Sequence, residues 1–283
     1  MRRLLFLIVL VMPLGAWADN VLDSLYVVVW LKPNGDAQFT EKRVMHVDDT
    51  GTEGYTVVSN LMEDSHIKEF KVFDDHSEQY YTHVPDWDAL HTRNEKALKC
   101  GVVESEPGTF CICWGLGHTG VREYWVSYTI TNVVRSFADY DAFCHQFIAP
   151  GMEPLPRYAE VIISRGSDFD FPEGSVKAWK QGYNGELRVG NHSIVAEKRS
   201  PLGSNEQVTL LCRVEKGVFQ PSLSTEMEFK ELSDDFTSAE KGHKGTTAKK
   251  KGRSIGTLIF AGILVWIALT AILLYGVKQW RKK

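Results

Sequence analysis

The sequence predicts an all-β protein: two β-sandwich (Ig-like) blocks with one short helix, followed by a flexible stalk and a single transmembrane helix. Three observations predict this class. Short runs of β-branched and aromatic residues recur along residues 19–232, with turn residues between them. Residues 255–277 are apolar and carry no charge, as a membrane span requires. Residues 233–254, which connect these regions, are rich in Lys, Gly, Ser and Thr.

The first 18 residues are typical of an export signal. Arg2 and Arg3 form a basic start, residues 4–14 form an apolar run, and Ala16-Trp17-Ala18 is a small-x-small cleavage site. The apolar run is shorter than the roughly 20 residues that a spanning helix needs. We therefore predict a signal peptide at 1–18 and a mature chain that begins near Asp19.

Residues 19–151 are predicted to form the first β-sandwich block. Its clearest element is a hairpin of residues 25–31 and 37–47 around a turn with Asn34-Gly35 at its centre. Further short strands are predicted at 55–59, 67–73, 79–83, 110–114 and 124–131. Alternation in the last of these strands predicts the side chains that face the core, namely Tyr124, Val126, Tyr128 and Ile130.

The apolar period changes after Arg135. Large apolar residues recur every three to four positions, at Phe137, Tyr140, Phe143 and Phe147. Asp139 is a residue type that caps helix N-termini, and Pro150-Gly151 would end the run. These spacings predict a short amphipathic helix that covers one end of the first sandwich.

Residues 152–232 are predicted to form a second, smaller β block after a hinge at 152–156. Its expected strands are 159–164, 186–189, 193–197 and 208–214. Turn residues such as Asn184-Gly185 and Gly190-Asn191 separate them. Residues 233–254 contain Phe236 as their one large apolar residue, so they are predicted to be a flexible stalk.

Residues 255–277 would form a helix of about 34 Å, long enough to cross a bilayer. Basic residues flank both ends equally, so the export signal decides the orientation. We expect a single-pass protein of the cell membrane with an extracytoplasmic ectodomain, periplasmic in a Gram-negative cell, and a cytoplasmic tail at 278–283. One side of the span carries mostly small residues, so two copies of the helix could pair and form a homo-oligomer. The residues on this side are Thr257, Ala261, Leu264, Ala268 and Ala271.

Charge is unevenly distributed along the chain. The chain carries 32 Lys and Arg and 36 Asp and Glu; residues 1–18 hold two of the basic residues, and residues 233–283 hold ten basic and three acidic ones. Residues 19–232 therefore have a net charge of −13. Because nucleic-acid-binding surfaces are basic, the sequence argues against nucleic acid as a partner.

Five cysteines lie in the region predicted to be exported, where disulfides are permitted. Cys111 and Cys113 share one face of a predicted strand, and Cys100 precedes it. A disulfide among these three residues is possible, although the odd total leaves at least one thiol unpaired. The alternative is that the cysteines are small buried hydrophobic residues.

The sequence offers two groups of candidate functional residues. A thiol- or metal-dependent envelope enzyme could use Cys111, Cys113, Cys144 and His145, but no hydrolase, metalloprotease or phosphate-binding motif accompanies them. The aromatic residues Tyr80, Tyr81 and Trp87 are predicted to lie in a loop and are candidates for binding. Equally, these rings could fasten the loop to the core.

Several motifs occur in an order that resembles a known family. A strand, a Pro-x-Gly turn and a Thr-Glu strand follow the export signal, and a Gly-x-x-x-Tyr-x-x-x-Tyr pattern comes later. An Asp-bearing aromatic segment followed by a Gly, a further strand and a Lys-Gly-x-Phe turn complete the order. The residues of these motifs, in chain order, are 25–31, 33–35, Thr40, Glu41, Gly120, Tyr124, Tyr128, 139–143, Gly151, 159–164 and 216–219. In these respects the chain resembles the predicted bacterial membrane proteins with the N-terminal domain of unknown function 2207. The resemblance implies a fold and a topology and no particular activity.

The sequence thus favours a membrane-anchored extracytoplasmic β-sandwich protein that binds another envelope or membrane protein. We predict no catalytic residues, no metal site and no cofactor. The envelope enzyme is the alternative, and a structural surface protein without a specific ligand is a third reading that the sequence leaves open.

Overall fold

The computed structural model describes residues 20–166 and 170–246, with side chains up to Ser238. The chain divides into two compact units at the bond between Phe236 and Thr237, and all the strands described below lie in the first of them. The predicted signal peptide, transmembrane helix and cytoplasmic tail lie outside the described residues, as does the end of the predicted stalk. Within the described ranges, neither helix combines the length and apolar character that crossing a bilayer requires.

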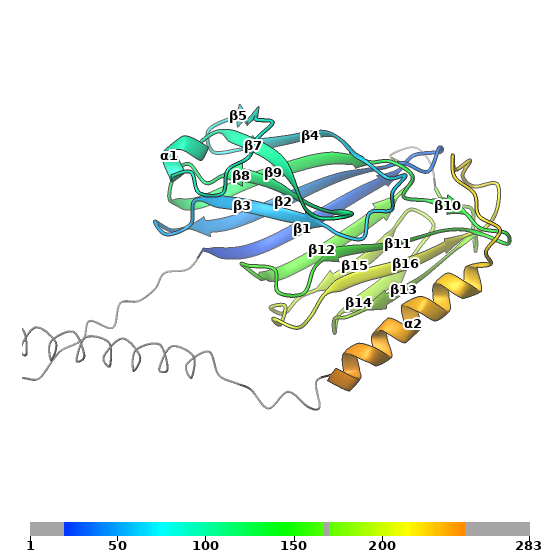
Figure 1. Cartoon of the computed structure of the whole chain (residues 1–283). Helices are drawn as coiled ribbons and strands as arrows, with labels where there is room; N and C mark the ends of the chain where they lie inside the picture. Colours follow the sequence, from blue (N-terminus) through cyan, green and yellow to red (C-terminus); the bar gives the residue numbers. More distant parts are fainter. Residues whose placement is uncertain (1–19, 167–169, 247–283) are drawn as a thin grey trace, which may run out of the picture. The chain divides into compact units, whose positions relative to one another are not determined.

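The all-β class is confirmed, because the described residues form three sheets and two helices (Figure 1). The largest sheet has eight strands in the order β14-β15-β12-β1-β2-β9-β4-β5. Their bounds are β1 (Val21–Leu31), β2 (Ala37–Val47), β4 (Ile67–Asp74), β5 (Gln79–Tyr80), β9 (Gly120–Ile130), β12 (Pro156–Ser164), β14 (Glu186–Val189) and β15 (Ile194–Lys198).

Two four-stranded sheets accompany the large sheet. One has the order β10-β11-β16-β13, with β10 (Arg135–Ser136), β11 (Asp141–Ile148), β16 (Val208–Val214) and β13 (Val176–Gln181). The other has the order β3-β8-β7-β6, with β3 (Glu53–Val58), β8 (Thr109–Gly115), β7 (Lys99–Glu106) and β6 (Thr82–His83). The helices are α1 (Arg93–Lys96) and α2 (Phe229–Thr246).

The predicted N-terminal hairpin is confirmed as β1 and β2. The turn closes with a hydrogen bond of 2.8 Å from the Lys32 N–H to the Asp36 carbonyl. Gly35 adopts φ +88°, a conformation that favours glycine, and a Cβ there would lie 2.6 Å from the Val134 carbonyl oxygen. Glycine therefore serves both the turn and the close approach of a second segment.

The two predicted blocks share one sheet, which differs from the expected separation. β12, from the expected second block, pairs in parallel with β1 over eight residue pairs, and β15 and β14 extend the sheet beyond it. One hydrophobic cluster includes side chains from both regions, such as Val27, Phe39 and Ile163. The boundary at residue 151 is therefore not a boundary between cores. Local patterning missed this because a parallel pair across more than 100 residues leaves no local sequence signal.

The core faces of the strands follow the predicted alternation. Tyr124, Val126, Tyr128 and Ile130 are all buried, as expected. The Tyr128 ring stacks on Phe39 of β2, with ring centroids 5.0 Å apart. Aromatic packing of this kind adds to the apolar area that the strand buries.

A buried ion pair links the large sheet to the sheet of β3. Arg43 donates two hydrogen bonds to one carboxylate oxygen of Glu41, at 2.9 and 2.7 Å, and a third to the Tyr55 carbonyl at 2.9 Å. The other Glu41 oxygen accepts from the Tyr128 hydroxyl at 2.8 Å and from the Thr56 hydroxyl at 3.0 Å. Because both charges are buried and satisfied, removing one partner would leave the other uncompensated.

The short helix predicted after Asp139 is wrong, because residues 141–148 form strand β11. Both faces of β11 carry buried residues: Phe143 lies in the main core, and Ala142 lies in a second cluster beneath α2. A bulge between Gln146 and Ile148 further shifts the alternation. Apolar residues on both faces produced a spacing that imitates a helix.

The first part of the predicted flexible stalk is also different. Residues 233–246 belong to helix α2, which begins at Phe229. Phe229, Leu232 and Phe236 pack with the second cluster. Their spacing of three and four residues places them on one side of a helix, whereas the polar composition of the segment had suggested disorder.

Candidate binding face

The side of the eight-stranded sheet that faces away from the core is termed the outer face here. The strand register aligns one residue from each strand in a single row across this face. In strand order, the row is Glu186, Glu197, Glu160, Tyr26, Lys42, Trp125, Phe73 and Tyr80. The face is therefore acidic at one end and aromatic at the other.

The aromatic end of the outer face is built from β2, β9, β4 and β5. The Lys42 ammonium group lies 5.1 Å from the Trp125 ring centroid and 2.8 Å from Glu123, which also accepts from the Trp125 indole N–H at 2.9 Å. Phe73 and Tyr80 contact each other, with ring centroids 5.0 Å apart. Trp125 is nevertheless 36% exposed and Tyr80 is 70% exposed. These rings are thus held in position while much of their surface faces solvent.

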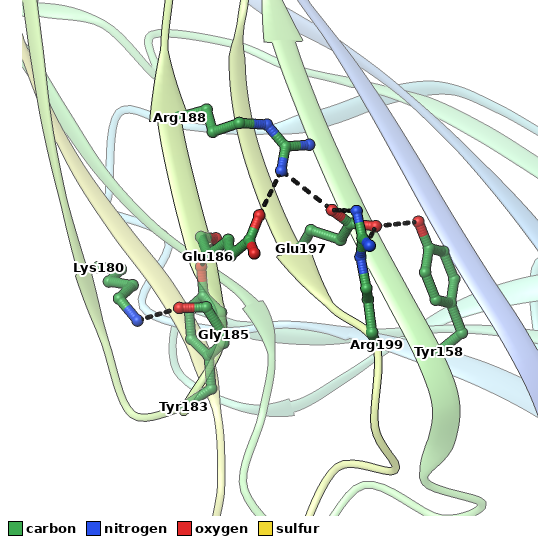
Figure 2. Close-up of polar contacts among 8 residues, drawn as sticks. All are labelled: Tyr158, Lys180, Tyr183, Gly185, Glu186, Arg188, Glu197 and Arg199. Atoms are coloured by element: carbon green, nitrogen blue, oxygen red, sulfur yellow. Dashed lines mark hydrogen bonds and ion pairs between the residues drawn. The ribbon is translucent and has the colours of Figure 1, made fainter.

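The acidic end of the outer face is organised around Glu197. Figure 2 shows Arg188, Arg199 and Tyr158 converging on this carboxylate. Arg199 donates at 2.9 and 3.1 Å, Arg188 at 3.1 Å and the Tyr158 hydroxyl at 3.0 Å. The hydrogen bonds from Arg199 are the main reason that the pKa of Glu197 falls to about 2. Glu197 therefore stays ionised and fixes both guanidinium groups.

Neighbouring contacts complete this end of the sheet. Arg188 also bonds to Glu186 at 2.6 Å, and Lys180 of β13 donates to the Gly185 carbonyl (Figure 2). Desolvation, together with the hydrogen bond to Glu197, raises the pKa of Tyr158 to about 12. The hydroxyl therefore remains a proton donor across the physiological pH range.

Glu160 differs from its neighbour Glu197. It lies directly between Glu197 and Tyr26 in the register, and the Tyr26 and Tyr158 rings are 5.4 Å apart beside it. In the described part of the chain, the carboxylate of Glu160 forms neither a hydrogen bond nor an ion pair, unlike that of Glu197. A half-buried carboxylate next to two aromatic rings is suited to accept a cationic side chain from outside.

The three aromatic residues predicted to bind are not brought together. Tyr80 lies on the outer face in β5, whereas Tyr81 is 8% exposed and packs in the core against Tyr124. The indole N–H of Trp87 donates to Glu53 at 3.0 Å, and its Cβ lies over Gly101. One of the three residues thus belongs to the exposed face, one to the core and one to a loop that covers β7 and β8.

The loop around Trp87 is held by a buried lysine. Lys96 of α1 contacts Glu53 at 2.9 Å, the Ala89 carbonyl at 2.6 Å and the Thr52 hydroxyl at 3.0 Å. A hollow of about 60 Å³ lies next to it, lined by residues that include Trp87 and His91. Small-molecule sites usually occupy roughly 300–1,000 Å³, so this hollow is too small for such a ligand.

The possible disulfide among Cys100, Cys111 and Cys113 is not formed in the structure, where the five cysteines are free. Cys100 lies opposite Trp114 and shares its core-facing side, whereas Cys113 lies opposite Gly101 and points to the other side of the sheet. Burial raises the pKa of Cys100 to about 11 and that of Cys113 to about 12. These two thiols are therefore protonated at neutral pH.

The residues of the alternative enzyme site are also apart. Cys111 and Cys113 are on β8, whereas Cys144 and His145 are on β11 of a different sheet and point to opposite sides of it. His145 packs against Phe39 and Phe147, with ring centroids 4.9 and 4.8 Å away, and burial lowers its pKa to about 4. Within residues 20–166 and 170–246, no group of three or more candidate ligands could hold a metal ion.

Sequence patterning did not indicate the outer face as a site. Its members, including Tyr26, Trp125 and Glu160, occur in strands that were predicted correctly in type. Alternation shows which residues point outward, and Arg188, Glu197 and Arg199 follow it. The register that places them in one row depends on strand pairing, which local patterns do not specify.

The fold and the outer face define an all-β domain with one aromatic and charged sheet surface exposed. The chain belongs to the family of predicted membrane proteins with the DUF2207 N-terminal domain, whose family model matches residues 22–206. The match includes most of the motif residues named above and ends before residues 216–219. This confirms the resemblance and places the outer face within the family domain.

Solved structures give weak similarity. A candidate protease from Parabacteroides distasonis ATCC 8503 is 10% identical, with a TM-score of 0.39, and the match covers 70% of this chain and 41% of that one. Yeast LTA4 hydrolase in complex with bestatin is 7% identical, with a TM-score of 0.39, and the match covers 68% of this chain and 28% of that one. The chain thus spans less than half of these structures. No curated protein matches it.

Proposed function

We propose that this protein is a membrane-anchored extracytoplasmic module that binds another protein of the cell envelope through its outer face. The observation that carries the proposal is the row of aromatic and charged residues across the eight-stranded sheet. Trp30 is 46% exposed and Val121 65% exposed, so further large apolar side chains reach solvent from strands of the same sheet. Aromatic residues and arginine are the residue types enriched in protein interfaces.

The dimensions of the face support a protein partner. Strands about 4.8 Å apart make a sheet of eight strands roughly 34 Å wide. A face of that width can supply the roughly 800 Å² that each partner buries in a stable complex. The fixed rotamers of Trp125, Arg188 and Arg199 also reduce the entropy lost on binding, because their hydrogen bonds already hold them.

Membrane anchoring belongs to the same proposal. The family description as predicted membrane proteins and the apolar sequence of residues 255–277 both support it. The basic start and apolar run of residues 2–14 support an extracytoplasmic ectodomain with a short cytoplasmic tail. A partner in the envelope follows from that location.

Site-specific photo-crosslinking in intact cells tests the proposal. A photoreactive amino acid replaces Trp30, Trp125 or Tyr80 on the outer face, and replaces Met62 or Leu90 in the controls. Met62 and Leu90 are exposed by 56% and 93% and lie in loops outside the sheet. We expect the three outer-face positions to yield the same crosslinked protein and the two control positions to yield none of it.

The charge variant Glu160→Lys sharpens this test, because it should abolish the crosslink from Trp125 if a cationic side chain of the partner meets Glu160. A crosslink between two copies of the chain would identify the face as a homo-oligomer interface. Equal crosslinking from Met62 and Trp125, or none from any position at normal expression, would contradict the proposal.

A further inference from the structure

The segment that leaves the last strand is tied closely to two earlier turns. We call residues 218–236 the exit segment, because they connect β16 to the main length of α2. The Gln220 N–H donates to the Pro33 carbonyl at 2.7 Å, and the Ser222 N–H donates to the Asn34 carbonyl at 3.2 Å. Further on, the Thr225 N–H donates to the Ser136 carbonyl at 2.8 Å, and the Ser136 N–H donates to the Leu223 carbonyl at 3.0 Å. The exit segment is thus part of the folded domain.

The sheet β10-β11-β16-β13 is called the second sheet here. The first two turns of α2 lie on its side that faces away from the core (Figure 1). The Phe229 N–H donates to the Asp139 carboxylate at 2.8 Å, so a residue from another segment caps the helix. The Phe229 ring centroid lies 5.6 Å from that of Trp179. At the other end of the contact, the Gln181 side-chain amide donates to the Phe236 carbonyl at 3.1 Å.

The contact has its own small hydrophobic cluster. Phe137, Ala142, Leu211 and Phe229 are buried in it, and this cluster is separate from the main core. Leu232 and Phe236 are only partly buried. Besides this cluster, the cap from Asp139 and the hydrogen bond from Gln181 hold the helix. Because these contacts lie outside the main core, the helix can open without unfolding that core.

We propose that this side of the second sheet is a reversible docking site for the chain's own α2, with Asp139 as the residue that fixes the helix in place. The docked state holds the chain in position as far as Phe236. Release frees the first two turns of α2, lengthens the predicted stalk and exposes Leu211, Tyr140 and more of Trp179, which is 39% exposed in the docked state. This inference goes beyond the proposed function and does not depend on the outer face.

Arginine 213 strengthens the docked state from the sheet side. Its guanidinium carbon lies 3.8 Å from the Tyr140 ring centroid and 5.9 Å from that of Phe229. The guanidinium group thus links Tyr140, which precedes β11, to Phe229 of the helix. Two of the family motifs each contact the exit segment: residues 33–35 bond to Gln220 and Ser222, and Asp139 of 139–143 bonds to Phe229.

Hydrogen–deuterium exchange on the full chain in nanodiscs tests the proposal. We expect the amides of residues 229–236 to exchange faster than those of β1 and β2, yet slower than an unstructured peptide. Asp139→Ala should raise the exchange rate at 229–236 about fivefold to tenfold, as loss of a helix cap does, and leave β1 and β2 unchanged. The exposed Asp75→Ala is the matched control and should change neither region.

Three results would overturn the proposal. Exchange of 229–236 at the same slow rate as β1 and β2 would make α2 a permanent part of the core. Exchange at the rate of a free peptide in the unaltered chain would mean that the helix does not dock. An unchanged rate in Asp139→Ala would remove the role of the cap. If Asp139→Ala also loosens β1 and β2, Leu232→Ala, which leaves the sheet untouched, replaces it with the same expectations.

Discussion

His145 lies in an apolar environment that opposes its protonation. Phe39 and Phe147 contact its ring, and burial lowers its pKa to about 4 from an ordinary value near 6.5. The unfolded chain therefore binds a proton between pH 6.5 and 4 that the folded chain does not bind. By linkage, the folded state loses stability as the pH falls through this window and loses none from His145 above it.

The variant His145→Phe should remove that dependence. We expect its free energy of unfolding to change less than that of the parent chain between pH 6.5 and 4, by about 2–3 kcal/mol over the window. Denaturant titrations at several pH values measure this difference. The exposed His118→Asn is the control and should keep the parental pH dependence. Identical pH profiles for His145→Phe and the parent would refute the assignment.

Asp139 shows how far a single residue can be interpreted from sequence. Its residue type predicts a helix cap. The sequence assigns that cap to a helix directly after Asp139, whereas Asp139 caps α2, 90 residues later in the chain. The residue type of Asp139 therefore indicates a cap, but the helix that it caps is distant in the sequence. Glu41 and Tyr128 behave likewise, since each occurs in a recognised motif and their hydrogen bond is visible only when β2 and β9 pair.

At the scale of single elements, the absence of a side chain at Gly115 allows the loop that contains α1 to pack closely on β8. A Cβ at Gly115 would overlap the carbonyl group of Lys96, whereas a Cβ at Gly117 would lie 3.9 Å from the Ala97 Cβ. The close approach of the loop to the strand therefore requires glycine at position 115, whereas position 117 has room for a side chain. The approach also positions Lys96 for its contact with Glu53.

We expect Gly115→Ala to destabilise the protein by about 1–3 kcal/mol, because the loop must move away from the strand. Gly117→Ala, two residues away, should change the stability by less than about 0.5 kcal/mol. Thermal unfolding of both variants, followed by circular dichroism, gives the comparison. Equal stability of the two variants would show that the loop yields easily and does not depend on Gly115.

Elements were predictable from sequence where one side faces the core and the other faces solvent. β2 was predicted with its observed bounds, and β9 was predicted at 124–131, whereas it begins at Gly120. The prediction for residues 141–148 was wrong because α2 covers the second side of β11, so that both sides carry apolar residues. Helix α2 was not predicted because its three apolar residues, Phe229, Leu232 and Phe236, pack on a surface that forms only when the protein folds. β7 and β13 were not predicted, and only two positions of each strand are buried.

At the scale of the whole molecule, the shared core predicts one cooperative unfolding transition for the described domain. Ile163 of β12 is fully buried, whereas its neighbour Ile162 points to the outer face and is partly exposed. Ile163→Ala should cost about 2–5 kcal/mol, and Ile162→Ala should cost clearly less. Calorimetry should show a single transition for both variants. Two resolved transitions in Ile163→Ala would instead support separate folding of residues 19–151.

The sheet that unites the molecule was beyond sequence analysis for a physical reason. The hydrophobic pattern identifies β1 and β12 as buried strands, but several strands with the same pattern could pair with either. Only the complete fold selects the parallel pair of Leu25 with Ala159. The outer-face row depends on the same choice, so the candidate site was unpredictable along with it.

The parallel pair also imposes an order of events on biogenesis. β1 and β2 are made early and can form their hairpin at once, but the other edge of β1 stays unpaired until residues 156–164 emerge. At about 5–20 residues per second, ribosomes need several seconds or more to supply them. During that delay an apolar strand edge is open to pairing with other chains. The nascent protein should therefore depend on a chaperone that shields this edge, and overproduction should increase its misassembly.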